Sequence, residues 1–184
     1  SSSSYSSRDI VALKRVLSRE IPLIIRADRA SDILFLINFS VEKNIRLIIM
    51  GGSEAWMVAK QLANTKTPVI LEPINNLPSS FNQLGARLDN ASLLEKAGVK
   101  ILIASHETHN SYLSRQAAGI AVSYGLPWDV ALKSLTSNVA EVFGLKKIGM
   151  IEIGYKADLI IWGKDPLEIS AFAEQIYILS LIHI

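Results

Sequence analysis

The chain has 184 residues, of which 49% are hydrophobic and 20% are charged, and it contains no cysteine. This length suits one domain or part of a larger one, and the lack of cysteine excludes disulfides, cysteine-ligated zinc and thiol catalysis. The formal net charge is only +2 without a Lys/Arg cluster in the sequence, so we expect neither nucleic acid nor a membrane as a partner. No apolar run reaches the roughly 18 residues that span a bilayer, and no segment has the charged and apolar regions of a signal peptide, which leaves cytoplasm and periplasm both open.

The first hundred residues alternate helical patterns with short apolar runs. The helical patterns predict helices over residues 9–20, 31–43, 53–63 and 91–97. Ser53 is the expected N-cap of the third helix. The apolar runs predict strands over residues 22–25, 46–50, 68–71 and 99–103, and a loop rich in Pro and Asn precedes the fourth helix. Because these strands are apolar along nearly their whole length, we expect parallel pairing with both faces buried.

The last third of the chain has the most specific pattern. Pro127 marks a helix start and Gly144 a helix stop around apolar residues at helical spacing, which predicts a packed helical pair. Two short apolar runs follow, at residues 150–153 and 157–162, and they predict a hairpin-like strand pair. Asp158, within the second run, is interpreted as a solvated carboxylate rather than a catalytic group.

Two motifs of this region occur in a fixed order: T-x-N-x-A at residues 136–140 and G-x-I-x-x-G-x-x-A-D-L-x-x-W at residues 149–162. In this order they resemble the C-terminal end of the amidohydrolase superfamily, imidazolonepropionase-like branch, and the resemblance extends over residues 20–168. It implies an α/β fold, with the last four β/α units of a (β/α)8 TIM-type barrel, then helices and a short β-hairpin of a small composite β-domain. The chain is thus interpreted as a fragment of a longer protein, with a half-barrel over 1–145, strands of the small domain over 146–168 and a tail over 169–184 that is partly artefactual in its last residues.

The resemblance also implies where chemistry would lie, because the carboxyl ends of the strands carry the active site of such a barrel. At these ends the family places metal-ligating His and Asp residues. Here Arg26 and Asp28 stand at the positions of the first two histidines, Gly51 stands at that of the next, and His106 replaces an Asp. A guanidinium cannot ligate a cation. We therefore expect a degenerate metal site with no metal in this chain, although zinc remains possible in the full-length family, and His106 is the only matching ligand position.

Asp28 and His106 are the predicted catalytic residues, and the predicted substrate-binding residues are Arg26, Glu54, His109 and Asn110. The spacing of the two histidines would place both on one side of a helical turn. The alternative is a solvated loop with exposed histidines. For Arg26, the alternative to holding a substrate carboxylate is a salt bridge with Asp28 or Glu54.

The resemblance implies that the full-length protein hydrolyses C–N bonds in cyclic amides, dipeptides or similar small molecules, and we expect this chain alone to be inactive. The alternative is a metal-free pseudoenzyme that binds a small molecule or serves as a scaffold. A self-contained flavodoxin-like domain is disfavoured by the terminal motifs. Half a barrel would leave strand edges and the inner face of the sheet uncovered, so we expect a homo-oligomer that buries them. Residues 51–53 are interpreted as a turn rather than a phosphate site, because the dinucleotide fingerprint is absent.

Overall fold

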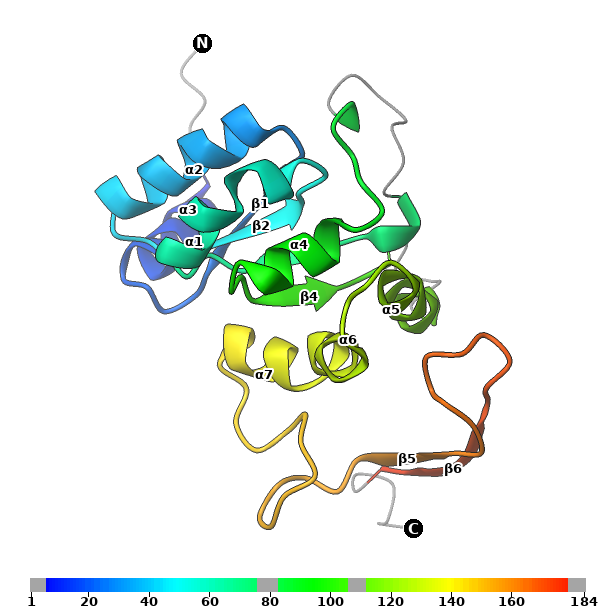
Figure 1. Cartoon of the computed structure of the whole chain (residues 1–184). Coiled ribbons are helices and arrows are strands. Elements are labelled where there is room, and N and C mark those ends of the chain that lie inside the picture. The colour runs from blue at the N-terminus through cyan, green and yellow to red at the C-terminus, as the bar shows by residue number, and fades with distance from the viewer. Residues whose placement is uncertain (1–5, 76–82, 106–111, 179–184) are drawn as a thin grey trace.

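The computed structural model describes residues 6–75, 83–105 and 112–178, and its main feature is a parallel sheet (Figure 1). The sheet has four strands in the order β1-β2-β3-β4: Leu23–Ala27, Leu47–Gly51, Val69–Leu71 and Ile101–Ile103. All three strand pairs are parallel, so the four strands begin at one edge of the sheet and end at the opposite edge. Consecutive parallel strands joined through helices are the repeating unit of a (β/α)8 barrel. The predicted fold class, a partial barrel, is confirmed.

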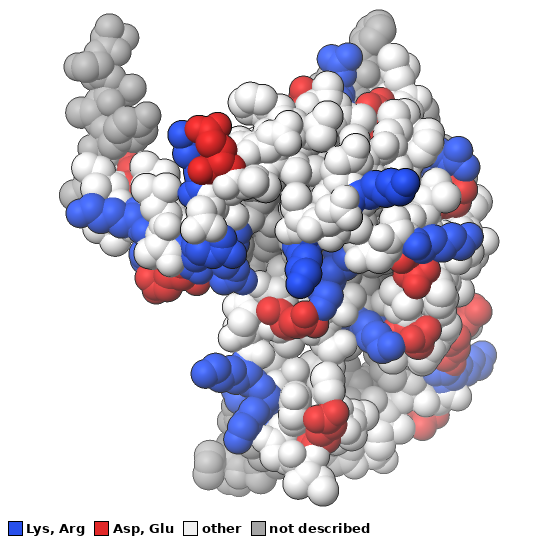
Figure 2. All heavy atoms as spheres, turned by 60° about the vertical axis from the view of Figure 1, so that its left-hand side comes forward, with Lys and Arg blue, Asp and Glu red and all other residues white. Residues whose placement is uncertain are grey.

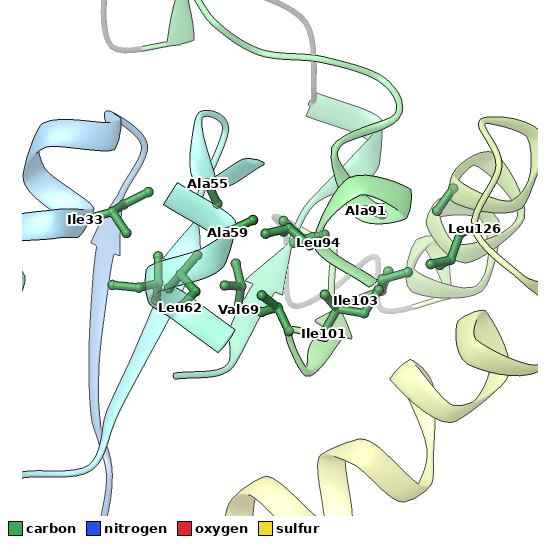
Figure 3. Packing of buried hydrophobic residues seen from close by; sticks show 14 of the residues in the cluster. Ile33, Ala55, Ala59, Leu62, Val69, Ala91, Leu94, Ile101, Ile103 and Leu126 are labelled. Carbon is green, nitrogen blue, oxygen red and sulfur yellow. The ribbon is translucent and has the colours of Figure 1, made fainter. Parts of the chain in front are cut away.

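Helices pack against both faces of this sheet. In chain order the helices are α1 Ser7–Leu17, α2 Ala30–Glu42, η1 Ala55–Val58, α3 Ala59–Asn64, η2 Pro73–Asn75, α4 Asn90–Lys96, α5 Leu113–Ser123, α6 Trp128–Leu135 and α7 Ser137–Phe143. The main core lies between α2 to α5 and the sheet, where Ile33, Leu62 and Leu94 are fully buried against Val69 and Ile101 (Figure 3). The predicted helices exist with ends shifted by a few residues, but α5 has no counterpart among them.

The turn after β2 differs from the prediction in the role of Ser53. Ser53 caps no helix; the chain instead passes through the 3-10 turn η1 before α3 begins. Gly51 and Gly52 have φ of +92° and +67°, a left-handed conformation that costs glycine little. This turn directs the backbone N–H and hydroxyl of Ser53 toward Asp28 rather than toward the helix.

The inner face of the sheet, which bears Ile48, Ile70 and Leu102, contradicts the expectation that it is uncovered. Those residues are buried, and Val139 and Val142 of α7 pack on them. Gly144 ends α7 in the left-handed conformation, at φ +68°, as predicted for a helix stop. The inner face is still exposed at the edge strand β1. Its Ile24 side chain, in register with Ile48, is 43% exposed.

The small β-unit also differs from the prediction. Strand β5, Leu159–Trp162, pairs antiparallel with β6, Ala173–Tyr177, and residues 150–153 form no strand. The side chains of Ile151 and Ile153 are exposed, and glycines with positive φ bracket them, so the apolar pattern there has no sheet partner. The segment predicted as a tail therefore provides a strand. Within the described ranges, no helix is long and apolar enough to cross a membrane.

Candidate functional site

An ion pair joins the ends of β1 and β3. The Arg26 guanidinium donates from Nη2 to Glu72 Oε1 at 2.7 Å and from Nη1 to Oε2 at 3.1 Å. The Glu72 side chain is 7% exposed and that of Arg26 is 42% exposed. The hydrogen bonds to Glu72 raise the pKa of Arg26 above its ordinary value, so the guanidinium stays charged. These two hydrogen bonds fix the plane of the Arg26 guanidinium, and the other N–H donors of the guanidinium are not used by Glu72.

Asp28 lies beside this pair and is held by the turn after β2. Its Oδ1 accepts hydrogen bonds from Ser53 Oγ at 2.8 Å and from Ser53 N at 3.2 Å. The backbone is locked as well, because Glu54 N donates to the carbonyl of Asp28 at 2.9 Å. Within the described residues Oδ2 accepts no hydrogen bond, so one carboxylate oxygen remains for a ligand.

Gly51 explains how Arg26 and Asp28 come together. A Cβ at Gly51 would lie 2.7 Å from Asp28 Oδ1 and 3.5 Å from Arg26 Nη1. The two charged groups therefore flank one point above the end of β2. Because position 51 has no side chain, Arg26 reaches across β2 to Glu72, which is not the partner that the sequence suggested. The same contacts leave no space for the imidazole that the family pattern places here.

Glu54 has a positioning role in this arrangement. Its Oε2 accepts from Ala30 N, at the start of α2, at 2.9 Å, and its Oε1 accepts from Gly85 N at 3.1 Å. A carboxylate at a helix N-terminus also interacts favourably with the helix dipole. Both oxygens thus contact the backbone, and Glu54 fastens the segment around Gly85 to α2. Trp56 adds to this link, since its Nε1 donates to the Gly85 carbonyl at 2.9 Å.

Asn90 is a supporting residue that the sequence did not reveal. Its side chain is fully buried, and Nδ2 donates to the Gly52 carbonyl at 2.9 Å. The bond ties the start of α4 to the turn that holds Asp28. Its Oδ1 is buried without a hydrogen-bond partner in the part of the chain that the structure describes. The only available signal was a polar amide directly before an apolar helical pattern.

The site thus unites Arg26 and Asp28, whereas Glu54, a predicted substrate contact, has both carboxylate oxygens bound to backbone N–H groups. His106, His109 and Asn110 lie outside the described residues, so their predicted roles stay predictions. A narrow pocket of about 10 Å³ is bordered by Asp28, Gly51 and Glu72. A volume on the order of 10 Å³ holds no more than a water molecule, so a ligand would contact the exposed side of Arg26 and Asp28.

These residues do not fit the metal that the family pattern implies. Both oxygens of Glu72 accept from Arg26, and Asp28 Oδ1 accepts from Ser53. A dication near Glu72 would face the positive charge of Arg26. Among the described residues, no three His, Asp or Glu side chains lie close enough together to hold a metal ion.

We accordingly expect the purified chain to contain no stoichiometric zinc, iron or nickel when its metal content is measured by mass spectrometry. The physical reason is the guanidinium at the end of β1, which contributes charge but no lone pair. The His106→Ala variant is the control, because His106 is the remaining ligand position. A full equivalent of metal that disappears in this variant would contradict the expectation.

Comparisons with known proteins agree with this fold. The profile of the amidohydrolase family matches residues 2–179. An amidohydrolase from Thermotoga maritima MSB8 is 31% identical with a TM-score of 0.86, over 95% of this chain and 46% of its own. An uncharacterized metal-dependent hydrolase from Pyrococcus furiosus is 16% identical with a TM-score of 0.63, over 89% of this chain and 38% of its own.

Another solved structure is a prolidase complexed with N-methylphosphonate-L-proline, 20% identical with a TM-score of 0.70, over 95% of this chain and 48% of its own. A shorter match, 39% identical over 56 residues, is to "Amidohydrolase tasK" of Hapsidospora irregularis and covers 30% of this chain and 6% of that protein. The chain thus spans about half or less of the length of these solved relatives. The match along most of its length, together with the half-barrel, shows that this chain belongs to the amidohydrolase family.

Proposed function

We propose that this chain forms a metal-free, substrate-binding wall of a small-molecule site, and that the longer protein hydrolyses a C–N bond of that molecule. The observation that carries the proposal is the placement of Arg26 and Asp28 on either side of Gly51. Family membership supports hydrolysis. The order of the C-terminal motifs favours the imidazolonepropionase-like branch within the family.

The chemistry of the two groups indicates the ligand. The N–H donors that Arg26 does not share with Glu72 suit a carboxylate or a carbonyl oxygen, and Asp28 Oδ2 suits an amide N–H. Because Glu72 already neutralises Arg26, the guanidinium contributes direction more than net charge. A molecule with a carboxylate next to an amide N–H, such as an N-acylated amino acid or a dipeptide, satisfies both groups.

The hydrolytic step would need a base for the attacking water. Asp28 and His106 are the residues that we propose for proton transfer, with His109 and Asn110 as further substrate contacts. We propose that the isolated chain does not catalyse the step, because loops from eight strands surround the mouth of a complete barrel and this chain provides half of them. Proximity of all reacting groups is what makes such a step fast.

A metal-free binding or scaffold protein is the second candidate function. The contacts around Gly51 favour it, since they occupy the place of a metal ligand. We also propose that the chain forms a homo-oligomer. Large apolar side chains are exposed on the described surface, among them Leu17 at 63% and Phe35 at 67%, and a partner subunit would bury such groups.

The test is the binding of N-acetyl-L-alanine to this chain, followed by NMR titration. Arg26→Met is expected to weaken binding roughly 10- to 100-fold, because a hydrogen bond to a charged group contributes about 1.5–3 kcal/mol. Arg29→Met is the matched control, since Arg29 is exposed three positions away and its side chain makes no cap hydrogen bond. Equal affinity in the two variants, or no binding by the unmodified chain, would refute the proposal.

A further inference from the structure

A large groove lies at the opposite edge of the sheet, where the strands begin. Its volume is about 830 Å³, and it extends from the ends of α2 and α3 to α7. Figure 2 looks onto this face, and basic side chains gather around its central hollow. The volume falls within the range of ligand-binding pockets, roughly 300–1,000 Å³.

The basic side chains of this groove come from distant parts of the sequence. Arg19, Arg46, Lys66 and Lys100 border it, each shortly before a strand, and Glu141 is the acidic residue there. Their separation along the chain is the reason that no basic run appears in the sequence. Only the fold brings these charges together.

Most of this positive charge is not neutralised by carboxylates. Lys100 pairs with Glu141. Arg46 Nη2 instead donates to the Val142 carbonyl at 2.7 Å, and Arg19 Nη1 donates to Asn44 Oδ1 at 2.6 Å, so both contact neutral oxygens. Within the described residues, neither arginine nor Lys66 pairs with a carboxylate. The groove therefore has a positive field with two arginines already fixed in place.

The rest of the lining is mixed in character. Val41, which is 63% exposed, and Pro22 give it apolar surface, and Thr65 brings a hydroxyl group to its edge. Apolar surface beside convergent charged groups is typical of a site for a small organic ligand rather than for a polymer that tracks a flat basic face.

We propose that this groove binds a small molecule that carries a di- or triphosphate, with Arg19, Arg46 and Lys66 as the phosphate contacts. Arginine and lysine are the side chains that recognise phosphate, and the phosphate chain spreads several negative charges over the distance between them. The site lies at the opposite edge of the sheet from Arg26 and Asp28. It is therefore independent of the function proposed above.

The test is calorimetric titration of the chain with pyrophosphate. We expect saturable binding of one pyrophosphate per chain that weakens as salt is added. The double variant Arg19→Asn, Lys66→Asn is expected to bind at least about tenfold more weakly, because two charges facing the anion are removed. Both residues have positive φ, at 62° and 51°, which asparagine tolerates, so the variant should remain folded.

The matched control is Lys146→Asn, Lys147→Asn, which removes the same charge outside the groove and includes one position with φ of 58°. Pyrophosphate affinity equal to that of the unmodified chain in this control, with weaker binding in the groove variant, supports the site. Absence of binding, or equal losses in both double variants, overturns it. Binding of single-stranded DNA that pyrophosphate does not displace also overturns it, because the groove would then serve a polymer.

Discussion

Replacing Gly51 by alanine is expected to lower the free energy of unfolding by about 3 kcal/mol. Part of the loss comes from the backbone, since φ is +92° and a left-handed conformation costs a residue with a Cβ about 1–2 kcal/mol. The rest comes from contact, because the new Cβ would lie 2.7 Å from Asp28 Oδ1. Overpacking of this kind costs roughly 1–3 kcal/mol.

Gly98→Ala separates the two contributions. Gly98 has φ of +83°, and no atom lies within 4 Å of the place that its Cβ would take, so this variant should lose only the backbone part, about 1–2 kcal/mol. Urea unfolding of both variants gives the difference. Adding Asp28→Ala to Gly51→Ala should recover part of the loss, as a double-mutant cycle would detect. Equal losses at the two glycines would mean that Asp28 does not crowd Gly51.

Local patterns were sufficient to predict the helices and the parallel strands, and the resemblance of the C-terminal motifs implied that these belong to half a barrel. Strands β2 to β4 are apolar at nearly every position, and strands buried on both faces require this. The prediction that Pro127 and Gly144 bound the α6–α7 pair is also confirmed. The backbone preferences of proline and glycine act without tertiary contacts, so the sequence alone reveals them.

Features that depend on distant contacts could not be predicted in this way. Strand β5 pairs with β6, which lies in the segment predicted as a tail. The apolar run of β5 indicated that a strand exists, but such a run does not reveal the partner of the strand. Arg26 pairs with Glu72, 46 positions away, through the space above Gly51. The basic groove likewise depends on loops that only the fold assembles. Site chemistry of this kind is a property of the tertiary structure.

The coverage of the inner face by α7 leads to the second large effect. Leu102→Asp is expected to lower the free energy of unfolding by about 4 kcal/mol or more, because Leu102 is 3% exposed and packs with Ile48, Ile70 and Val142. A carboxylate there would lose its water without a partner, and such burial is among the few single changes that cost more than about 4 kcal/mol.

Ile24→Asp is the matched control on the same face. Ile24 is in register with Ile48 on the edge strand, but it is 43% exposed, so a carboxylate there keeps much of its water. We expect this variant to lose only about 1 kcal/mol, the typical effect of a point mutation. Thermal unfolding of both variants, with a hydrophobic dye present, measures the difference. If α7 did not cover the centre of the inner face, the two carboxylates would both be hydrated and the two losses would be similar.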